Sequence, residues 1–176
     1  MREVVKALYY GAPETALSIA AAEGALRICS NDEVARRVLI ERWERSRTED
    51  LSDTLIVAST NVEVRELNRE AQARRIATGE IGGRRAKCDG AHYFQGDRVV
   101  FKVNVPSLGV NGVVNGDFGD VVRVSPGDLG NPWLLIKLDR KFQSADGERD
   151  ICVRVSASQL RLKRFGERRS LISHGY

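Results

Sequence analysis

The sequence lacks several features that define common classes of protein. It contains neither a Gly-x-x-x-x-Gly-Lys-[Ser/Thr] segment nor any Gly-Lys pair, which excludes a phosphate-binding P-loop within these 176 residues. No apolar run approaches the roughly 18 residues of a membrane-spanning helix, so we expect no membrane partner. The opening Met1-Arg2-Glu3 does not begin a secretory signal. Three widely spaced cysteines (Cys29, Cys88 and Cys152) form no Cys-x-x-Cys pair and no even set, which predicts reduced thiols and a cytoplasmic location.

The side chains of common catalytic sites are also scarce. There are only two histidines, His92 and His174. Cys88 and His92 are close enough in sequence to share a metal ion, but two ligands do not make a zinc site. No Ser/His/Asp set or pair of catalytic carboxylates stands out. We therefore expect no catalytic residue, no metal site and no resident cofactor in this chain.

Charge is present in quantity, but it is unevenly distributed. Lys and Arg number 28 against 24 Asp and Glu, a net charge of +4. Residues 1–80 hold 12 basic and 14 acidic side chains, whereas residues 81–176 hold 16 basic and 10 acidic. Arginine, whose planar fork matches phosphate and stacks on bases, outnumbers lysine 22 to 6. The second half thus predicts either a polyanionic partner or a solvated basic face.

The first half has the pattern of alternating helices and strands. Helical spacing is found in residues 4–9, 13–24 and 34–43, and the apolar run 25–29 predicts a strand between the second and third helices. Ser30-Asn31-Asp32-Glu33 fits a capping box at the start of the third helix, with the Ser30 hydroxyl as the cap. We interpret Asp32 and Glu33 as part of that cap rather than as Mg²⁺-binding acids, because the latter should directly follow an apolar strand.

A strand, a polar turn and a helix are predicted next. Leu55-Ile56-Val57-Ala58 is a continuous apolar run, typical of a buried parallel strand. Ser59-Thr60-Asn61 follows it, and Thr60-x-x-Glu63 is a capping box for a helix that ends near Gly79. The amino terminus of such a helix is a common anion site. Thr60 is therefore either a cap alone or a cap that also contacts a bound anion.

After a Gly- and Arg-rich connector at residues 80–95, the apolar period changes to two. Strands are predicted at 98–103, 121–124, 133–138 and 151–155, which suggests a small closed barrel of the SH3 or OB type. We expect its aromatic residues to fill the barrel core, the alternative being a protein-contact patch (Tyr93, Phe94, Phe101, Phe118 and Trp133). The strongly basic segment 161–169 could line a nucleic-acid path or be a solvated strand.

The order of these segments resembles the second RecA-like domain of RecD-like, superfamily-one DNA helicases, in particular the helicase regions of conjugative relaxases of the TraA/TraI type. The family's strand ending in Thr-Asn and helix with Val-x-x-Leu-Asn are matched by residues 55–61 and 64–68. Its Gly-Asp-Arg-Val-x-Phe element is matched by residues 96–101. Its Leu-Gly-Val and Asn-Gly-x-x-Gly-x-Val elements are matched by 108–110 and 115–121, with residues 110–114 lengthening the loop between them. The chain ends on His174-Gly175-Tyr176, where the family continues into a further motif.

The resemblance implies a fold and a domain organisation. It predicts an α/β region with a partial RecA-like parallel sheet at residues 1–90. An SH3-like β-barrel insert should follow at 91–166, and a truncated return into the RecA-like lobe at 167–176. The resemblance also implies a fragment of an ATP-dependent helicase, because the P-loop, the acidic Mg²⁺ motif and the arginine finger of the family lie outside this chain. ATP and Mg²⁺ would then be cofactors of the parent protein, and this chain alone would not hydrolyse ATP.

The resemblance further implies partners and contact residues. Single-stranded DNA would be bound by seven residues from the helix start and the basic segments (Thr60, Asn61, Arg98, Lys102, Arg161, Lys163 and Arg164). The other partners would be the first RecA-like lobe of the same protein and a conjugative secretion apparatus. The alternative hypothesis is a protein–protein docking module recognised by a secretion or other partner, and an independent small enzyme is disfavoured by the missing catalytic sets.

Overall fold

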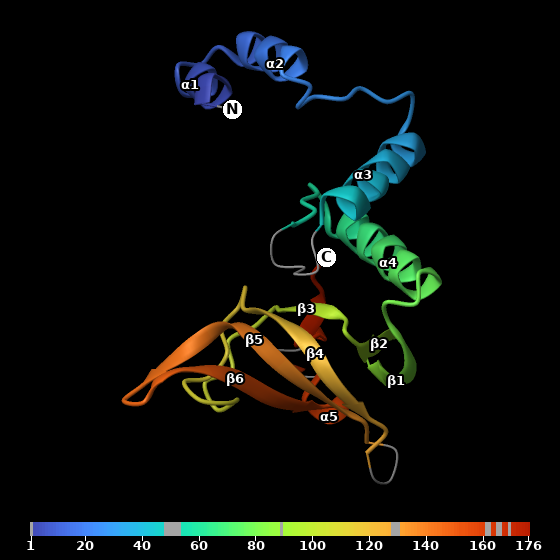
Figure 1. Ribbon diagram of the computed structural model, residues 1–176, viewed down its shortest axis with the longest axis vertical. Helices are drawn as coiled ribbons and strands as arrows, with labels where there is room; N and C mark the ends of the chain where they lie inside the picture. Colours follow the sequence, from blue (N-terminus) through green and yellow to red (C-terminus); the bar gives the residue numbers. More distant parts are fainter. Residues whose placement is uncertain are drawn as a thin grey trace. The chain divides into compact units, whose positions relative to one another are not determined.

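The computed structural model describes residues 2–47, 54–88, 90–127, 131–160, 163–164, 167–168 and 170–176. By its internal contacts the chain forms two compact units, Met1–Glu41 and Arg42–Tyr176. The predicted boundaries at residues 90 and 166 both lie within the second unit and stay a prediction. Within the described residues, the architecture is mixed α/β, with helices in the first half and antiparallel strands in the second (Figure 1).

The first unit is helical. It contains α1 (Arg2–Tyr9), α2 (Pro13–Ala22) and the first part of α3 (Asp32–Ser46). The amino terminus of α3 is capped by Asn31, whose Oδ1 accepts a hydrogen bond from the Val34 backbone nitrogen at 2.9 Å. The cap is therefore one residue later than the predicted Ser30, while Asp32 and Glu33 lie in the first helical turn as expected. The predicted strand at 25–29 is not formed, and Ile28 is 88% exposed.

The second unit begins with the end of α3 and continues to α4 (Asn61–Ala77). α4 confirms the predicted helix, and its buried residues Leu67, Asn68, Ala71 and Arg75 recur at helical spacing. The apolar run before it does not form the predicted buried parallel strand. Residues 54–58 lie outside any strand, and Leu55 and Val57 are 54% and 79% exposed. A strand needs a neighbour for its backbone hydrogen bonds, and the described residues provide none here.

The rest of the second unit is built from antiparallel strands. A hairpin of β1 (Gly82–Cys88) and β2 (Ala91–Gln95) precedes a five-stranded sheet in the order β6-β5-β4-β3-β9. Its strands are β3 (Arg98–Phe101), β4 (Phe118–Ser125), β5 (Trp133–Ser144), β6 (Gly147–Ser156) and β9 (Ile172–His174). A short helix, α5 (Ala157–Leu160), and a small hairpin of β7 (Lys163–Arg164) and β8 (Glu167–Arg168) connect β6 to β9.

The sheet corrects two parts of the predicted fold. β6 and β9 are its two edges, so the described strands form an open sheet rather than a closed barrel. Every strand pair in the described residues is antiparallel, so no parallel RecA-like sheet is present there. The four strands predicted from the two-residue period are nevertheless all formed, with boundaries that differ by a few residues.

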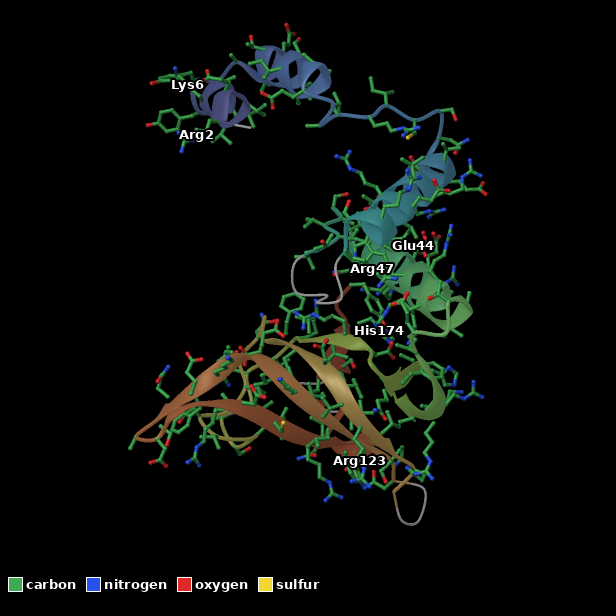
Figure 2. All side chains as sticks on the ribbon, viewed as in Figure 1. Arg2, Lys6, Glu44, Arg47, Arg123 and His174 are labelled. Atoms are coloured by element: carbon green, nitrogen blue, oxygen red, sulfur yellow. The ribbon has the colours of Figure 1, made fainter. Side chains whose placement is uncertain are left out.

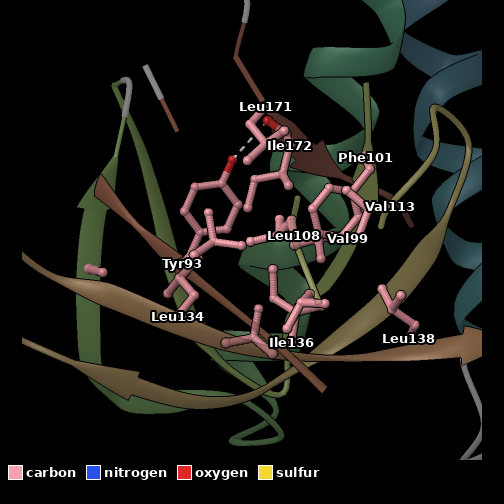
Figure 3. Packing of buried hydrophobic residues seen from close by; sticks show 14 of the residues in the cluster. Tyr93, Val99, Phe101, Leu108, Val113, Leu134, Ile136, Leu138, Leu171 and Ile172 are labelled. Carbon is pink, nitrogen blue, oxygen red and sulfur yellow. Dashed lines mark hydrogen bonds between the residues drawn. The ribbon is translucent and has the colours of Figure 1, made fainter. Parts of the chain in front are cut away.

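One apolar core lies on one face of the sheet (Figure 3). Alternate residues of the central strands supply it, including Val99, Val121, Ile136 and Val153, each at most 1% exposed. Tyr93 and Phe101 are 2% and 0% exposed, which confirms the core placement predicted for these two aromatic residues. Gly119 allows β4 and β5 to approach closely, because a Cβ there would lie 2.4 Å from the Lys137 carbonyl oxygen.

None of the helices in the described parts of the chain combines the length and the apolar character needed to cross a membrane.

Candidate nucleic-acid interface

The start of α4 carries two of the predicted DNA-binding residues, Thr60 and Asn61, and both are exposed. Thr60 forms the complete capping box: its Oγ1 accepts from the Glu63 backbone nitrogen at 3.2 Å, and its own backbone nitrogen donates to Glu63 Oε2 at 3.0 Å. Thr60 Oγ1 also donates to the same carboxylate at 2.9 Å, as does Ser59 Oγ. The pKa of Glu63 is lowered by its hydrogen bonds with Thr60 and then with Ser59.

This geometry decides what the helix start can bind. The Glu63 carboxylate already occupies the positive end of the helix and uses the Thr60 hydroxyl. A phosphate at this position would have to displace a negatively charged group and its hydrogen bonds. The structure therefore gives Thr60 a capping role, and its contact with DNA stays a prediction.

Arg98 lies at the start of β3 and is only 3% exposed. Its Nη1 donates to Asp139 Oδ1 at 2.6 Å and to Asp120 Oδ1 at 3.3 Å, while its Nη2 makes a further short contact with Asp139. Burial opposes the charge of Arg98, but the hydrogen bond and charge of Asp139, with the charge of Asp120, outweigh it and raise the pKa of Arg98. Arg98 thus connects β3, β4 and β5, and its guanidinium is already occupied by two carboxylates. We therefore do not carry Arg98 into the proposed DNA contacts.

The remaining predicted contacts lie in two connections between strands of the sheet, one after β3 and one between β6 and β9. Lys102 directly follows β3 and its side chain is exposed, while its backbone nitrogen donates to the Leu171 carbonyl at 2.9 Å. Lys163 and Arg164 form β7, which pairs with β8. Arg161 lies outside the described residues, and the structure describes only the backbone of Lys163 and Arg164.

A buried polar network that sequence reasoning missed joins the end of the chain to α4. It includes His174, which is labelled in Figure 2. Asn68 on α4 donates from Nδ2 to the His174 carbonyl at 2.9 Å and accepts from the Tyr176 backbone nitrogen at 3.0 Å. Gln72, one turn later, donates to the His92 carbonyl and to Asp97 Oδ2, and its Nε2 lies 2.9 Å from His174 Nε2. α4 therefore binds His174 and Tyr176 through the side-chain amides of Asn68 and Gln72.

Asp97 is the centre of that network and is fully buried. Its Oδ2 accepts from the Phe94 backbone nitrogen at 2.7 Å and lies 3.5 Å from His174 Nε2. Its Oδ1 accepts a short hydrogen bond from the Tyr176 hydroxyl. Burial, followed by the charge of Asp97, raises the pKa of Tyr176, so the phenol stays protonated. The arrangement holds the chain end in place.

Aromatic rings also pack around His174 and Tyr176. His174 stacks on Tyr93 at 4.6 Å between ring centroids and on Tyr176 at 5.9 Å. Trp43 meets Tyr176 edge-on at 5.9 Å, and the Arg75 guanidinium lies 5.4 Å from the Tyr176 ring centroid. No local pattern marks these residues, because the partners in the network are separated by up to 108 positions.

In the described part of the chain, no three His, Cys, Asp or Glu side chains come close enough together to hold a metal ion. The Cys88 side chain, one half of the Cys88–His92 pair, lies outside what the structure describes. Comparisons with protein-family models, with curated proteins and with solved structures found no match to this chain.

Proposed function

We propose that the chain is the single-stranded-DNA-binding part of an ATP-dependent DNA helicase of the RecD-like type found in conjugative relaxases. In this proposal residues 1–90 contribute to the second RecA-like lobe, residues 91–166 are its SH3-like insert, and residues 167–176 return to the lobe. The chain binds DNA but does not hydrolyse ATP, since ATP and Mg²⁺ would be bound by other parts of the parent protein. The partners would be the first RecA-like lobe and a conjugative secretion apparatus.

The observation that carries the proposal is the set of exposed, uncompensated cations in the second half of the chain. Some basic side chains there form ion pairs, such as Lys137 with Asp150 at 2.9 Å and Lys141 with Glu148 at 3.2 Å. Others are exposed and make no ion pair with any described residue (Arg84, Arg85, Lys87, Lys102, Arg123 and Arg154). Phosphate contacts by such cations release counterions and supply most of the non-specific affinity for nucleic acid.

A second observation supports the helicase part of the proposal. The segment before α4 is apolar and forms no strand with the described residues, yet Leu55 and Val57 remain exposed. Exposed apolar surface of this kind is expected where a neighbouring strand is supplied from elsewhere. In a RecA-like lobe this segment would be a strand of the parallel sheet that leads into the helix.

The test is a fluorescence-anisotropy titration of a labelled oligothymidylate at low salt. We expect the chain to bind the single strand, and Lys87→Gln with Lys102→Gln to weaken binding more than Lys137→Gln with Lys141→Gln. The second pair is the matched control, because it removes the same charge from lysines that are already paired with acids. No binding by the folded chain, or equal effects of the two pairs, would contradict the proposal. A partner complex that survives high salt would instead favour the docking module.

A further inference from the structure

The outer face of the five-stranded sheet carries a cluster of two arginines and a tryptophan from three neighbouring strands. The register of β4, β5 and β6 places Arg123, Leu135 and Arg154 in one row across the sheet. Trp133 lies two residues before Leu135 on β5 and therefore projects from the same face. Their neighbours along each strand point to the opposite face and are buried in the core (Val124, Leu134 and Val155).

Both arginines lie against the indole ring. The Arg154 guanidinium carbon is 4.4 Å from the Trp133 ring centroid, and that of Arg123 is 5.7 Å from it. Both distances are within the range of about 6 Å for cation–π contact. The two arginines are exposed while Trp133 is partly exposed, and Figure 2 labels Arg123 on β4.

The charge of this row is not neutralised by any residue in the described part of the chain. Neither Arg123 nor Arg154 forms an ion pair with any residue that the structure describes. The next row along the sheet differs, because its Lys137 is paired with Asp150 at 2.9 Å. Trp133 is itself flanked across the strands by two short side chains, Ser125 and Ser156.

A ligand that uses the whole cluster must carry a negative charge and, close beside it, a flat apolar surface. The charge would pair with the arginines and the flat surface would stack on the tryptophan. Single-stranded DNA has both, since its phosphates pair with arginine forks and its unstacked bases present their faces to aromatic rings. The bases of a duplex are stacked on one another and are not available in this way. An acidic peptide would satisfy the arginines but would leave the ring unused.

We propose that Arg123, Trp133 and Arg154 form a base-stacking and phosphate-binding site for single-stranded DNA. This inference rests on the proposed function and gives it a location. Sequence patterns assigned Trp133 to the core, and only the antiparallel register brings Arg123 and Arg154, which lie on separate strands, close to the same ring.

The experiment measures the affinity of the full chain for an oligothymidylate of about 15 nucleotides, the upper end of the site size of small β-domains. The first variant is Arg123→Gln with Arg154→Gln. Its matched control is Arg84→Gln with Arg85→Gln, which removes two exposed arginines that have neither an ion pair nor a ring contact among the described residues. A second comparison is Trp133→Leu against Trp133→Tyr, which keeps an aromatic face. Far-UV circular dichroism verifies that each variant is folded.

We expect the Arg123/Arg154 variant to bind at least about fivefold more weakly than the Arg84/Arg85 control, the loss that one stacking contact typically represents. Trp133→Leu should lose a similar factor, whereas Trp133→Tyr should bind nearly as well as wild type. DNA should also quench tryptophan emission in wild type more than in Trp133→Phe, in which Trp43 is the remaining tryptophan. This readout does not depend on the stability of the leucine variant.

The inference is overturned if both arginine pairs weaken binding equally, or if the emission of Trp133 does not change on saturation with DNA. Either result, with wild-type binding intact, would leave the proposed function standing and move the site elsewhere. Failure of the wild-type chain to bind any single strand would instead overturn the proposed function itself.

Discussion

The hydroxyl of Tyr176 connects the end of the chain to the buried Asp97, and its removal should measurably destabilise the second unit. In Tyr176→Phe, Asp97 Oδ1 loses a donor and Arg75 Nη1 loses a partner at 3.4 Å, while the ring keeps its contacts with Trp43 and His174. No cavity is created except the volume of one oxygen. A hydrogen bond to a charged group contributes about 1.5–3 kcal/mol. We therefore expect the free energy of unfolding to fall by about 2 kcal/mol, or the melting temperature by about 6–8 °C.

The assay is urea unfolding followed by far-UV circular dichroism, arranged as a double-mutant cycle. The second substitution is Asp97→Asn, which keeps an oxygen to accept from the Phe94 backbone nitrogen and Gln72. The two changes should not be additive, because each removes the charge-assisted hydrogen bond between the Tyr176 hydroxyl and the Asp97 carboxylate, and we expect a coupling free energy of about 1–2 kcal/mol. A loss below about 0.5 kcal/mol in Tyr176→Phe, or additive effects in the cycle, would refute the reasoning, since ordinary surface changes are that small.

Three further predictions concern other charged and capping groups. The pKa of Glu80 is lowered to about 2, chiefly by its hydrogen bond with Arg47, so its contribution to stability is present above about pH 4.5 and is lost as the pH falls towards 2. In Glu80→Gln the melting temperature should fall less steeply than in wild type as the pH is lowered through that range, which thermal melts at several pH values would measure. An unchanged pH dependence would contradict this. Thr60→Ala should cost about 1 kcal/mol by removing the cap of α4, whereas Thr60→Ser should restore most of it, both measured by chemical unfolding. Arg98→Leu should cost about 2–4 kcal/mol, because Asp139 loses its partner, yet the folded variant should bind DNA within about twofold of wild type. A large loss of DNA affinity in that folded variant would return Arg98 to the binding site.

Elements with a local signal could be predicted from the sequence. The capping box of Thr60 and Glu63 is complete within four consecutive residues, and both of its hydrogen bonds are formed. The strands of the sheet follow a two-residue alternation, so that Val99, Val121 and Val153 face the core as expected.

Features that depend on distant residues could not be predicted. Asn68 and Arg75 are polar side chains of α4, and polarity alone would place them in solvent. Both are only 7% exposed, because the chain end packs over them. The apolar run around Val57 predicted a buried strand, yet burial requires neighbouring strands that the described residues do not supply. Likewise, nothing in the sequence around Arg98 indicates that Asp139, 41 positions later, will pair with it.

The central claim is that exposed cations of the β-region hold single-stranded DNA through its phosphates. The most direct measurement is the binding constant for an oligothymidylate at several salt concentrations. We predict a linear fall of its logarithm with the logarithm of the salt concentration, with a slope of about −0.7 for each phosphate contacted. A folded chain that fails to bind at about 50 mM salt, or binds with no dependence on salt, would contradict the claim.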